Sequence, residues 1–223
     1  MSVMKPCSRR FSGAWLAVLL ILGWSAGWAR QPTIMVLGDS LSSGYGLELS
    51  QGWVSLLQQR LEQAGYPHRV VNASISGDTS RGGLGRLPAA LESHQPDIVI
   101  LELGGNDGLR GLSLEALAQN LATMIERSRQ AGARVALAEI RIPPNYGPRY
   151  TKQFQALYGE LAERYQLPLI PFLLNGVAAN KDLMQADGIH PRAEAQPRIL
   201  DNVWPVLEPL LPSPSSAGET AHP

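Results

Sequence analysis

The sequence predicts an α/β fold in which helices cover both faces of a parallel sheet of about five strands. Short apolar segments rich in Val, Ile and Leu recur along the chain, at residues 33–37, 69–73, 97–103, 134–140 and 167–172. Segments with apolar residues at helical spacing alternate with them, which is the order that produces parallel strands joined by helical crossovers. The near-continuous apolar character of residues 97–103 is typical of a strand that is covered on both faces.

One helix is expected after each strand. The expected helices span residues 53–64, 80–93, 114–131, 150–165 and 197–210. Ser113 is the expected N-cap of the third helix, because its hydroxyl can accept a backbone N–H of the first turn. Pro88 weakens the prediction of the second helix, and Pro205 should kink or shorten the last. Aromatic residues recur at helical spacing in the fourth helix, which favours a place in the core over a ligand stack.

Polar or glycine- and proline-containing segments between these elements are expected to be loops. The expected loops are residues 41–52, 74–79, 104–108, 143–148 and 187–191, and the structure of residues 173–184 is left open. The loop at 143–148 is rich in Pro and Gly, so neither a helix nor a central strand is expected there.

The first 29 residues are expected to be a signal peptide. A basic start with Lys5, Arg9 and Arg10 precedes an uncharged apolar stretch at residues 11–24, and small residues then predict cleavage after Ala29. An uncleaved N-terminal anchor is the alternative, although the apolar stretch is short for a membrane span. The general secretion route is favoured over twin-arginine export, because the surroundings of the two arginines match that signal poorly.

Cleavage would leave a domain at residues 30–211 and a tail at residues 212–223. The tail is rich in Pro, Ser and small residues, so it is expected to be disordered. The mature chain would carry 16 Lys and Arg against 19 Asp and Glu, a net charge of about −3 that argues against nucleic acid as a partner. The single cysteine, Cys7, would be removed, which excludes a disulfide, a thiol nucleophile and a cysteine metal site.

Polar residues follow the first three expected strands. Ser40 comes directly after the first strand, Gly77 lies in the loop after the second, and Asn106 follows the third between glycines and an acid. Since the carboxyl ends of parallel strands meet at one edge of a sheet, these loops should lie together. The loop with Asp187 and His190 is expected at the same edge.

These residue types suit nucleophilic catalysis. An Asp three residues before a His can bond one ring nitrogen while the other nitrogen faces outward. A strand-end amide such as Asn106, and a bare backbone N–H such as that of Gly77, can donate to a developing oxyanion. Each of these residues alone could be an ordinary turn residue. Four such features at one edge of the sheet favour a catalytic site. The other histidines, His68, His94 and His222, are expected at the surface.

Four ordered blocks resemble the SGNH (GDSL) hydrolase family. They are Gly38-Asp39-Ser40-Leu41, Gly77-Asp78-Thr79, Gly104-Gly105-Asn106-Asp107 and Asp187-Gly188-Ile189-His190-Pro191. The match runs through the whole expected domain, and the blocks together are specific although the first alone would be weak. The segments 102–111 and 144–147 are similar to bacterial periplasmic members. The resemblance implies a flavodoxin-like three-layer α/β/α sandwich.

The resemblance also implies a serine hydrolase that acts through an acyl-enzyme. Ser40 would be the nucleophile, His190 the general base and then the acid, and Asp187 the residue that orients His190. The backbone N–H groups of Ser40 and Gly77 and the side chain of Asn106 would form the oxyanion hole. No metal and no cofactor would be needed.

The implied substrates are small acyl esters and thioesters, including acyl-CoA, lysophospholipids and aryl esters. We expect a monomer in the periplasm, or secreted, of a Gram-negative bacterium, with no stable membrane insertion after cleavage. A carbohydrate deacetylase on the same scaffold, or a non-catalytic periplasmic binding module with an anion at residues 38–44, are the alternatives. Ser42 replaces the last glycine of a Gly-x-Ser-x-Gly elbow, which argues against the larger α/β-hydrolase fold. Asp39 and Asp107 are expected to form hydrogen bonds within turns.

Overall fold

A computed structural model describes Met1 and residues 30–212. All of the expected signal peptide except Met1, and all of the expected tail except Pro212, therefore lie outside the described residues. Within the described part, the chain from Gln31 onward belongs to one compact unit. None of the helices in this part is long and apolar enough to cross a membrane.

Five strands form one parallel sheet. They are β1 (Thr33–Gly38), β2 (Arg69–Asn72), β3 (Ile98–Glu102), β4 (Arg134–Ala138) and β5 (Leu169–Ile170). Their order in the sheet is β2-β1-β3-β4-β5, and every neighbouring pair is parallel. This is the flavodoxin-like order, in which ligands bind where the strand order reverses between β1 and β3. The predicted fold class is confirmed. β5 is shorter than expected because Pro168 and Pro171, which have no N–H for the ladder, flank it.

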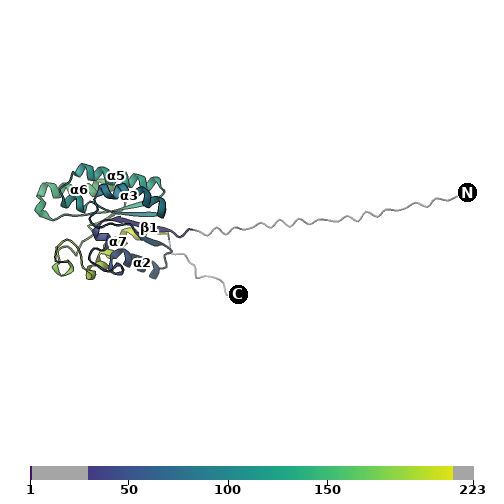
Figure 1. The fold of residues 1–223 in the computed structure, drawn as a ribbon, viewed down its shortest axis with the longest axis horizontal. Coiled ribbons are helices and arrows are strands. Elements are labelled where there is room, and N and C mark those ends of the chain that lie inside the picture. The colour runs from purple at the N-terminus through teal and green to yellow at the C-terminus, as the bar shows by residue number, and fades with distance from the viewer. Residues whose placement is uncertain (2–29, 213–223) are drawn as a thin grey trace. The chain divides into compact units, whose positions relative to one another are not determined.

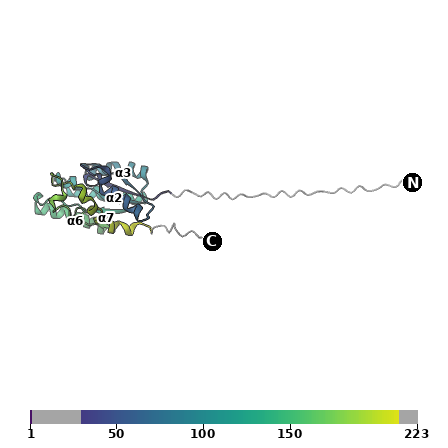
Figure 2. The ribbon, with the colours of Figure 1, turned by 90° about the horizontal axis from the view of Figure 1, so that it is seen from below.

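Helices cover both faces of the sheet (Figure 1). One face carries α2 (Trp53–Gln63) and α7 (Gln196–Leu207), and the other carries α3 (Ser80–His94), α5 (Leu114–Gln130) and α6 (Pro148–Tyr165). The helices α2 and α7 lie side by side, as Figures 1 and 2 both show.

Each face of the sheet has its own hydrophobic core, because successive side chains of a strand point to opposite faces. Ile34 and Val36 of β1 belong to the cluster under α2 and α7. Met35 and Leu37 belong to the cluster under α3, α5 and α6. The aromatic residues of α6 lie in this second core as predicted, with Phe154 and Tyr158 fully buried.

Short helical segments lie where loops were expected, namely α1 (Ser40–Ser43), α4 (Gly105–Leu109) and 3₁₀ turns at Leu49–Gln51 and Pro144–Tyr146. Two more 3₁₀ turns, at Lys181–Leu183 and Ala193–Ala195, lie where no structure was predicted. A third, Glu208–Leu210, forms the end of the expected last helix. Such segments are too short to show helical periodicity in a sequence. The expectation that residues 143–148 contain no helix is therefore wrong, since α6 also begins at Pro148, where a first-turn proline loses no hydrogen bond.

His68 is buried, which contradicts its expected place at the surface. It is 1% exposed, and its ring lies 6.3 Å from that of Tyr66 between centroids. Neither ring nitrogen has a hydrogen-bond partner among the described residues. The short connection from α2 to β2 places this residue just before a strand, and its ring faces inward. His94 is half-buried at the end of α3, and His222 lies outside the described residues.

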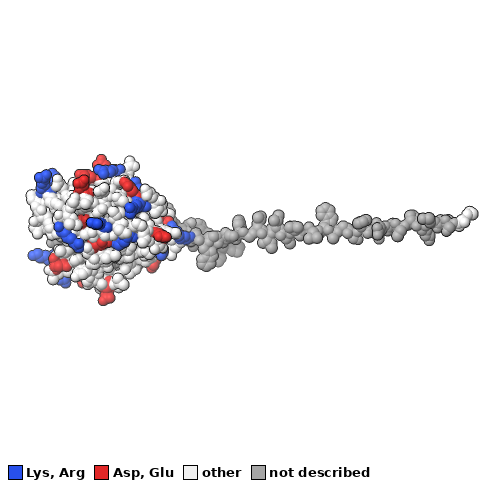
Figure 3. All heavy atoms as spheres, turned by 45° about the horizontal axis from the view of Figure 1, so that its top comes forward, with Lys and Arg blue, Asp and Glu red and all other residues white. Residues whose placement is uncertain are grey.

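Charged side chains of both signs are mixed on the surface. On the face drawn in Figure 3, Lys and Arg are interspersed with Asp and Glu and with neutral residues.

Candidate active site

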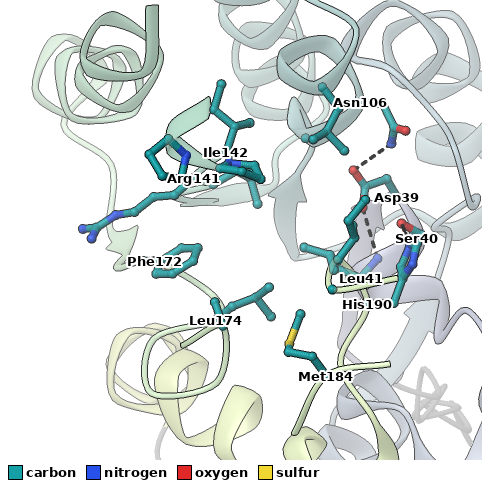
Figure 4. A pocket seen from close by; sticks show the side chains of 18 residues that line it. Asp39, Ser40, Leu41, Asn106, Arg141, Ile142, Phe172, Leu174, Met184 and His190 are labelled. Atoms are coloured by element: carbon teal, nitrogen blue, oxygen red, sulfur yellow. Dashed lines mark hydrogen bonds between the residues drawn. The ribbon is translucent and has the colours of Figure 1, made fainter. Parts of the chain in front are cut away.

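The predicted site residues lie in loops and short helices at the carboxyl edge of the sheet. Ser40 is the first residue of α1 directly after β1, Gly77 follows β2, and Asn106 lies in α4 after β3. Asp187 and His190 lie in the loop that precedes α7. Three of the five, Ser40, Asn106 and His190, line one pocket (Figure 4).

Ser40, His190 and Asp187 form a hydrogen-bonded line. The His190 Nε2 atom lies 2.8 Å from the Ser40 Oγ atom, and His190 Nδ1 lies 2.6 Å from Asp187 Oδ2. The other oxygen, Asp187 Oδ1, accepts the backbone N–H groups of Ile189 and His190 at 2.9 and 3.0 Å. The line orients the imidazole so that its second nitrogen faces the serine hydroxyl.

Asp187 is held in its ionised form. Partial burial raises its pKa, but the hydrogen bonds from the His190 ring and from the backbone N–H groups of His190 and Ile189 outweigh this effect and lower the pKa to about 2. A carboxylate at this position can stabilise a positively charged His190.

Tyr45 is a site residue that the sequence analysis missed. Its ring lies 4.4 Å from the His190 ring between centroids, at an interplanar angle of 38°. Its backbone carbonyl accepts a hydrogen bond of 2.9 Å from the Gln185 side chain, which connects the loop after β1 to the loop of His190. The flanking glycines, Gly44 and Gly46, are the sole hint in the sequence that this tyrosine lies in a turn.

Two of the backbone N–H groups that were predicted to donate to an oxyanion have no acceptor within the described residues. These are the N–H of Ser40, which starts a helix, and the N–H of Gly77. Gly77 has a φ of +79°, a left-handed conformation that favours glycine. It does not line the pocket. The Asn106 amide nitrogen, in contrast, donates to Asp39 Oδ2 at 3.1 Å and to the Asp78 carbonyl at 2.9 Å.

Two buried carboxyl groups lie behind the Ser40 turn. Glu102 Oε2 accepts the Asp39 backbone N–H at 3.2 Å and the Ser42 hydroxyl at 2.6 Å, all within the protein interior. Burial, and then the neighbouring Asp39 carboxylate, raise the pKa of Glu102 well above its ordinary value. Burial also raises the pKa of Asp39 to about 6, against the lowering effect of hydrogen bonds from Leu41 and Asn106. No role was predicted for Glu102, and its one signal in the sequence is that it is an acid near the end of an apolar strand.

The two acids expected in turns do form hydrogen bonds. Asp39 Oδ1 accepts the backbone N–H of Leu41 and thereby caps α1. Asp107 accepts both the backbone N–H and the hydroxyl of Ser80, at 2.8 and 2.6 Å, so it connects α4 to the start of α3 rather than to its own turn.

The pocket is a cavity of about 590 Å³ that extends from Ser40 and His190 over an apolar surface. Its apolar lining consists of Leu41, Leu109, Ile140, Ile142, Pro143, Pro144, Phe172, Leu174, Ala178, Met184 and Ile189. Arg141 lies at the opposite end with its guanidinium directed away from the cavity, 5.0 Å from the centroid of the Phe172 ring (Figure 4). Among the described residues, no three His, Cys, Asp or Glu side chains are grouped as ligands of one metal ion.

Residues 36–197 match the GDSL-like Lipase/Acylhydrolase family. The chain belongs to this family. It is 57% identical over 183 residues to the esterase TesA of Pseudomonas aeruginosa, a match that covers 82% of this chain and 91% of the relative. It is 46% identical over 183 residues to the thioesterase 1/protease 1/lysophospholipase L1 of Escherichia coli K12, covering 82% and 86% of the two chains.

A crystal structure of TesA matches this family member with a TM-score of 0.79 at 57% identity. The superposition covers 80% of this chain and 99% of the TesA chain. The predictions of an SGNH (GDSL) family member and of a hydrolase are confirmed.

Proposed function

We propose that this family member is a periplasmic or secreted serine hydrolase that cleaves acyl esters and acyl thioesters through an acyl-enzyme. The observation that carries the proposal is the chain of hydrogen bonds from Asp187 through His190 to Ser40, and Ser40 lines a mainly apolar pocket. The proposed enzyme consists of the domain at residues 30–211, released by cleavage after Ala29, with a tail at residues 212–223.

In the proposed reaction, Ser40 Oγ attacks the acyl carbon while His190 Nε2 takes its proton. The Asp187 carboxylate, whose pKa is lowered to about 2, stays ionised and stabilises the imidazolium. His190 then protonates the leaving alcohol or thiol, and the acyl group remains on Ser40. A water molecule, deprotonated by His190, hydrolyses the acyl-enzyme.

The proposed oxyanion hole consists of the N–H groups of Ser40 and Gly77 and the amide of Asn106. The first two have no protein acceptor among the described residues, which leaves them free for a substrate oxygen. Asn106 would share one of its two hydrogen bonds, to Asp39 or Asp78, with the oxyanion. Loss of one such donor costs about a hundred- to a thousandfold in kcat.

The apolar pocket supports an acyl chain as the group that is bound and transferred. Relatives named esterase, arylesterase and thioesterase/lysophospholipase support acyl esters, aryl esters, thioesters and lysophospholipids as the substrate class. Among the thioesters we propose acyl-CoA. The lining of the 590 Å³ pocket is mainly apolar, which suits an acyl chain better than the hydroxyl groups of a sugar, so no observation favours the deacetylase alternative. The mixed charges of the face in Figure 3 support a small-molecule substrate rather than nucleic acid. We propose a monomer without stable membrane insertion.

The test is hydrolysis by the purified chain without residues 1–29. A series of p-nitrophenyl esters from acetate to palmitate, a long-chain acyl-CoA and a lysophospholipid would be assayed, with Ser40→Ala as the inactive reference. We expect turnover of esters and thioesters that rises with chain length beyond acetate and is abolished in Ser40→Ala. Strict preference for acetate would contradict the substrate class, and equal turnover by Ser40→Ala would contradict the mechanism.

A further inference from the structure

We infer that Arg86 of α3 is a positioning residue for the proposed reaction. Its guanidinium joins the loop that carries the Gly77 N–H to the end of β1, two residues before Ser40. We call residues 73–79 the oxyanion loop. The inference rests on the proposed function, and it adds a residue that does not itself touch the substrate.

Arg86 makes three connections with one planar group. Its Nε atom donates to Asp78 Oδ2 at 2.7 Å, Nη1 donates to the Ala73 carbonyl, and Nη2 donates to the Gly38 carbonyl at 3.1 Å. The ion pair is mostly shielded from solvent, with the Arg86 and Asp78 side chains 21% and 13% exposed. Charge-assisted bonds of this kind are stronger than those between neutral groups.

The acceptors define what Arg86 holds together. Ala73 is where the chain leaves β2 and enters the oxyanion loop, and Asp78 is the residue directly after Gly77. Gly38 is the last residue of β1, two residues before Ser40. The guanidinium therefore fixes both ends of the oxyanion loop relative to the nucleophile. Lysine could not do this, because an ammonium lacks the rigid fork of donors.

Packing does little to hold the tip of this loop. A Cβ atom added to Gly77 would meet no atom within 4 Å, and the side chain of Ile75 is 54% exposed. The position of the Gly77 N–H thus depends on polar contacts. Besides those of Arg86, Arg110 Nη2 donates to the Gly77 carbonyl at 3.0 Å and Asn106 donates to the Asp78 carbonyl. The start of the loop is also bound to β1 by backbone bonds, from the Ala73 N–H to the Val36 carbonyl at 2.8 Å and from the Ile75 N–H to the Gly38 carbonyl at 3.1 Å. Arg86 adds the connection from Asp78, beside Gly77, to β1.

Gly82 supports the same inference independently. It lies in the first turn of α3, and a Cβ atom there would overlap Asp78 Oδ1. Asp78 would have to rotate away, although its other oxygen is bound by Arg86. Gly85, one turn further along the same helix, has open space where its Cβ would be. Glycine at position 82 therefore makes room for the carboxylate that Arg86 binds.

The test compares two ways of disturbing this contact with two matched controls. Arg86→Lys and Arg86→Ala remove the fork, and Gly82→Ala displaces Asp78. Arg60→Ala is the control for the Arg86 variants, because it breaks another Arg–Asp ion pair of the same 2.7 Å length, between α2 and α7. Gly85→Ala is the control for Gly82→Ala, because it adds a methyl group to the same helix.

We expect the Arg86 and Gly82 variants to lose about a hundredfold in kcat, because a displacement of about 1 Å can cost that much, while KM stays close to wild type. An alkyl boronic acid, which forms a tetrahedral adduct on the serine, should bind these variants more weakly by a similar factor. The Arg60 and Gly85 variants should keep kcat and boronate affinity. Thermal unfolding of every variant corrects each kcat for the folded fraction.

The inference is overturned if the Arg86 and Gly82 variants are less stable but retain wild-type kcat and boronate affinity per folded molecule. It is also overturned if Arg86→Lys has the kcat and the boronate affinity of wild type. Failure of the proposed function gives a different result: the wild-type chain would then hydrolyse none of the esters or thioesters, whatever residue 86 is.

Discussion

Replacing Glu102 tests how the interior supports the nucleophile turn. In Glu102→Ala the Asp39 N–H and the Ser42 hydroxyl, both buried, would lose their acceptor. Each unsatisfied buried donor costs about 1–3 kcal/mol, so the free energy of unfolding should fall by about 2–6 kcal/mol. For a domain of this size that is a decrease in Tm of about 4–24 °C. In Glu102→Gln an amide oxygen can accept both bonds. The amide nitrogen takes the place of Glu102 Oε1, which is buried without a partner, so the decrease should be smaller, about 1–3 kcal/mol.

The pH dependence of the same variants follows from the raised pKa of Glu102. Burial, and then Asp39, hold that pKa well above the ordinary 4.5, so above this value the native state binds more protons than the unfolded state. Stability contributed by protonated Glu102 is therefore complete below the ordinary pKa and is lost as the pH rises through the raised one. Glu102→Gln cannot titrate at this position, so its stability relative to wild type should improve as the pH rises above 4.5 toward the raised pKa of Glu102.

Urea unfolding followed by far-UV circular dichroism at several pH values measures both effects. Glu92→Gln, the same substitution at an exposed position of α3, is the matched control and should show neither the loss nor the pH trend. If Glu102→Gln were as unstable as Glu102→Ala near neutral pH, Glu102 would act as an ionised carboxylate, and the reasoning would be refuted.

Three further predictions concern the acid response, a helix terminus and the pocket. Burial lowers the pKa of His68 below 6.5, so below that pH the unfolded state binds more protons than the native state. The free energy of unfolding of the wild type, measured in urea, should therefore fall on acidification, and that of His68→Phe should fall less. Ser113 Oγ accepts the Ala116 N–H of α5, so Ser113→Ala should cost about 1 kcal/mol in thermal unfolding, whereas equal stability would exclude a capping role. Ala178 lines the pocket and Ala179 does not, so Ala178→Trp alone should shift the p-nitrophenyl ester preference toward shorter chains.

The sequence predicted the layers of this fold because they depend on long, regular patterns. The continuous apolar run that became β3 and the apolar stripe of α5 each extend over several residues, so one exception does not hide them. The Ser113 cap was found for a related reason, since its hydroxyl acts on the turn that follows it. The short helices α1 and α4 were missed because four or five residues carry no period.

The candidate site was predictable where residue type limits the chemistry. The chain has only four histidines, and Ser40, Asn106 and the pair Asp187 and His190 stand in the order of a known family. Their catalytic roles remain predictions until they are tested. Arg86 and Glu102 were missed for a physical reason: each reaches the Ser40 turn through a residue more than 40 positions away in sequence, Gly38 for Arg86 and Ser42 for Glu102. The sequence does not show which distant residue a charged side chain meets.

The buried state of His68 shows the same limit. A histidine beside a proline at a helix–strand junction resembles a surface residue in sequence, and its exposure of 1% depends on how α2 approaches β2. Packing determines which residues of different helices and strands come into contact, and a single sequence does not reveal that packing.

Labelling of Ser40 by a fluorophosphonate tests the central claim most directly. The chain without residues 1–29 would be reacted with the reagent, and the modified residue would be located by mass spectrometry of its peptides. The account predicts one adduct, on Ser40, with no labelling of Ser40→Ala and slow labelling of His190→Ala, whose serine lacks the base at 2.8 Å. Full labelling of Ser40→Ala, or an adduct on another residue of the active wild-type chain, would contradict it.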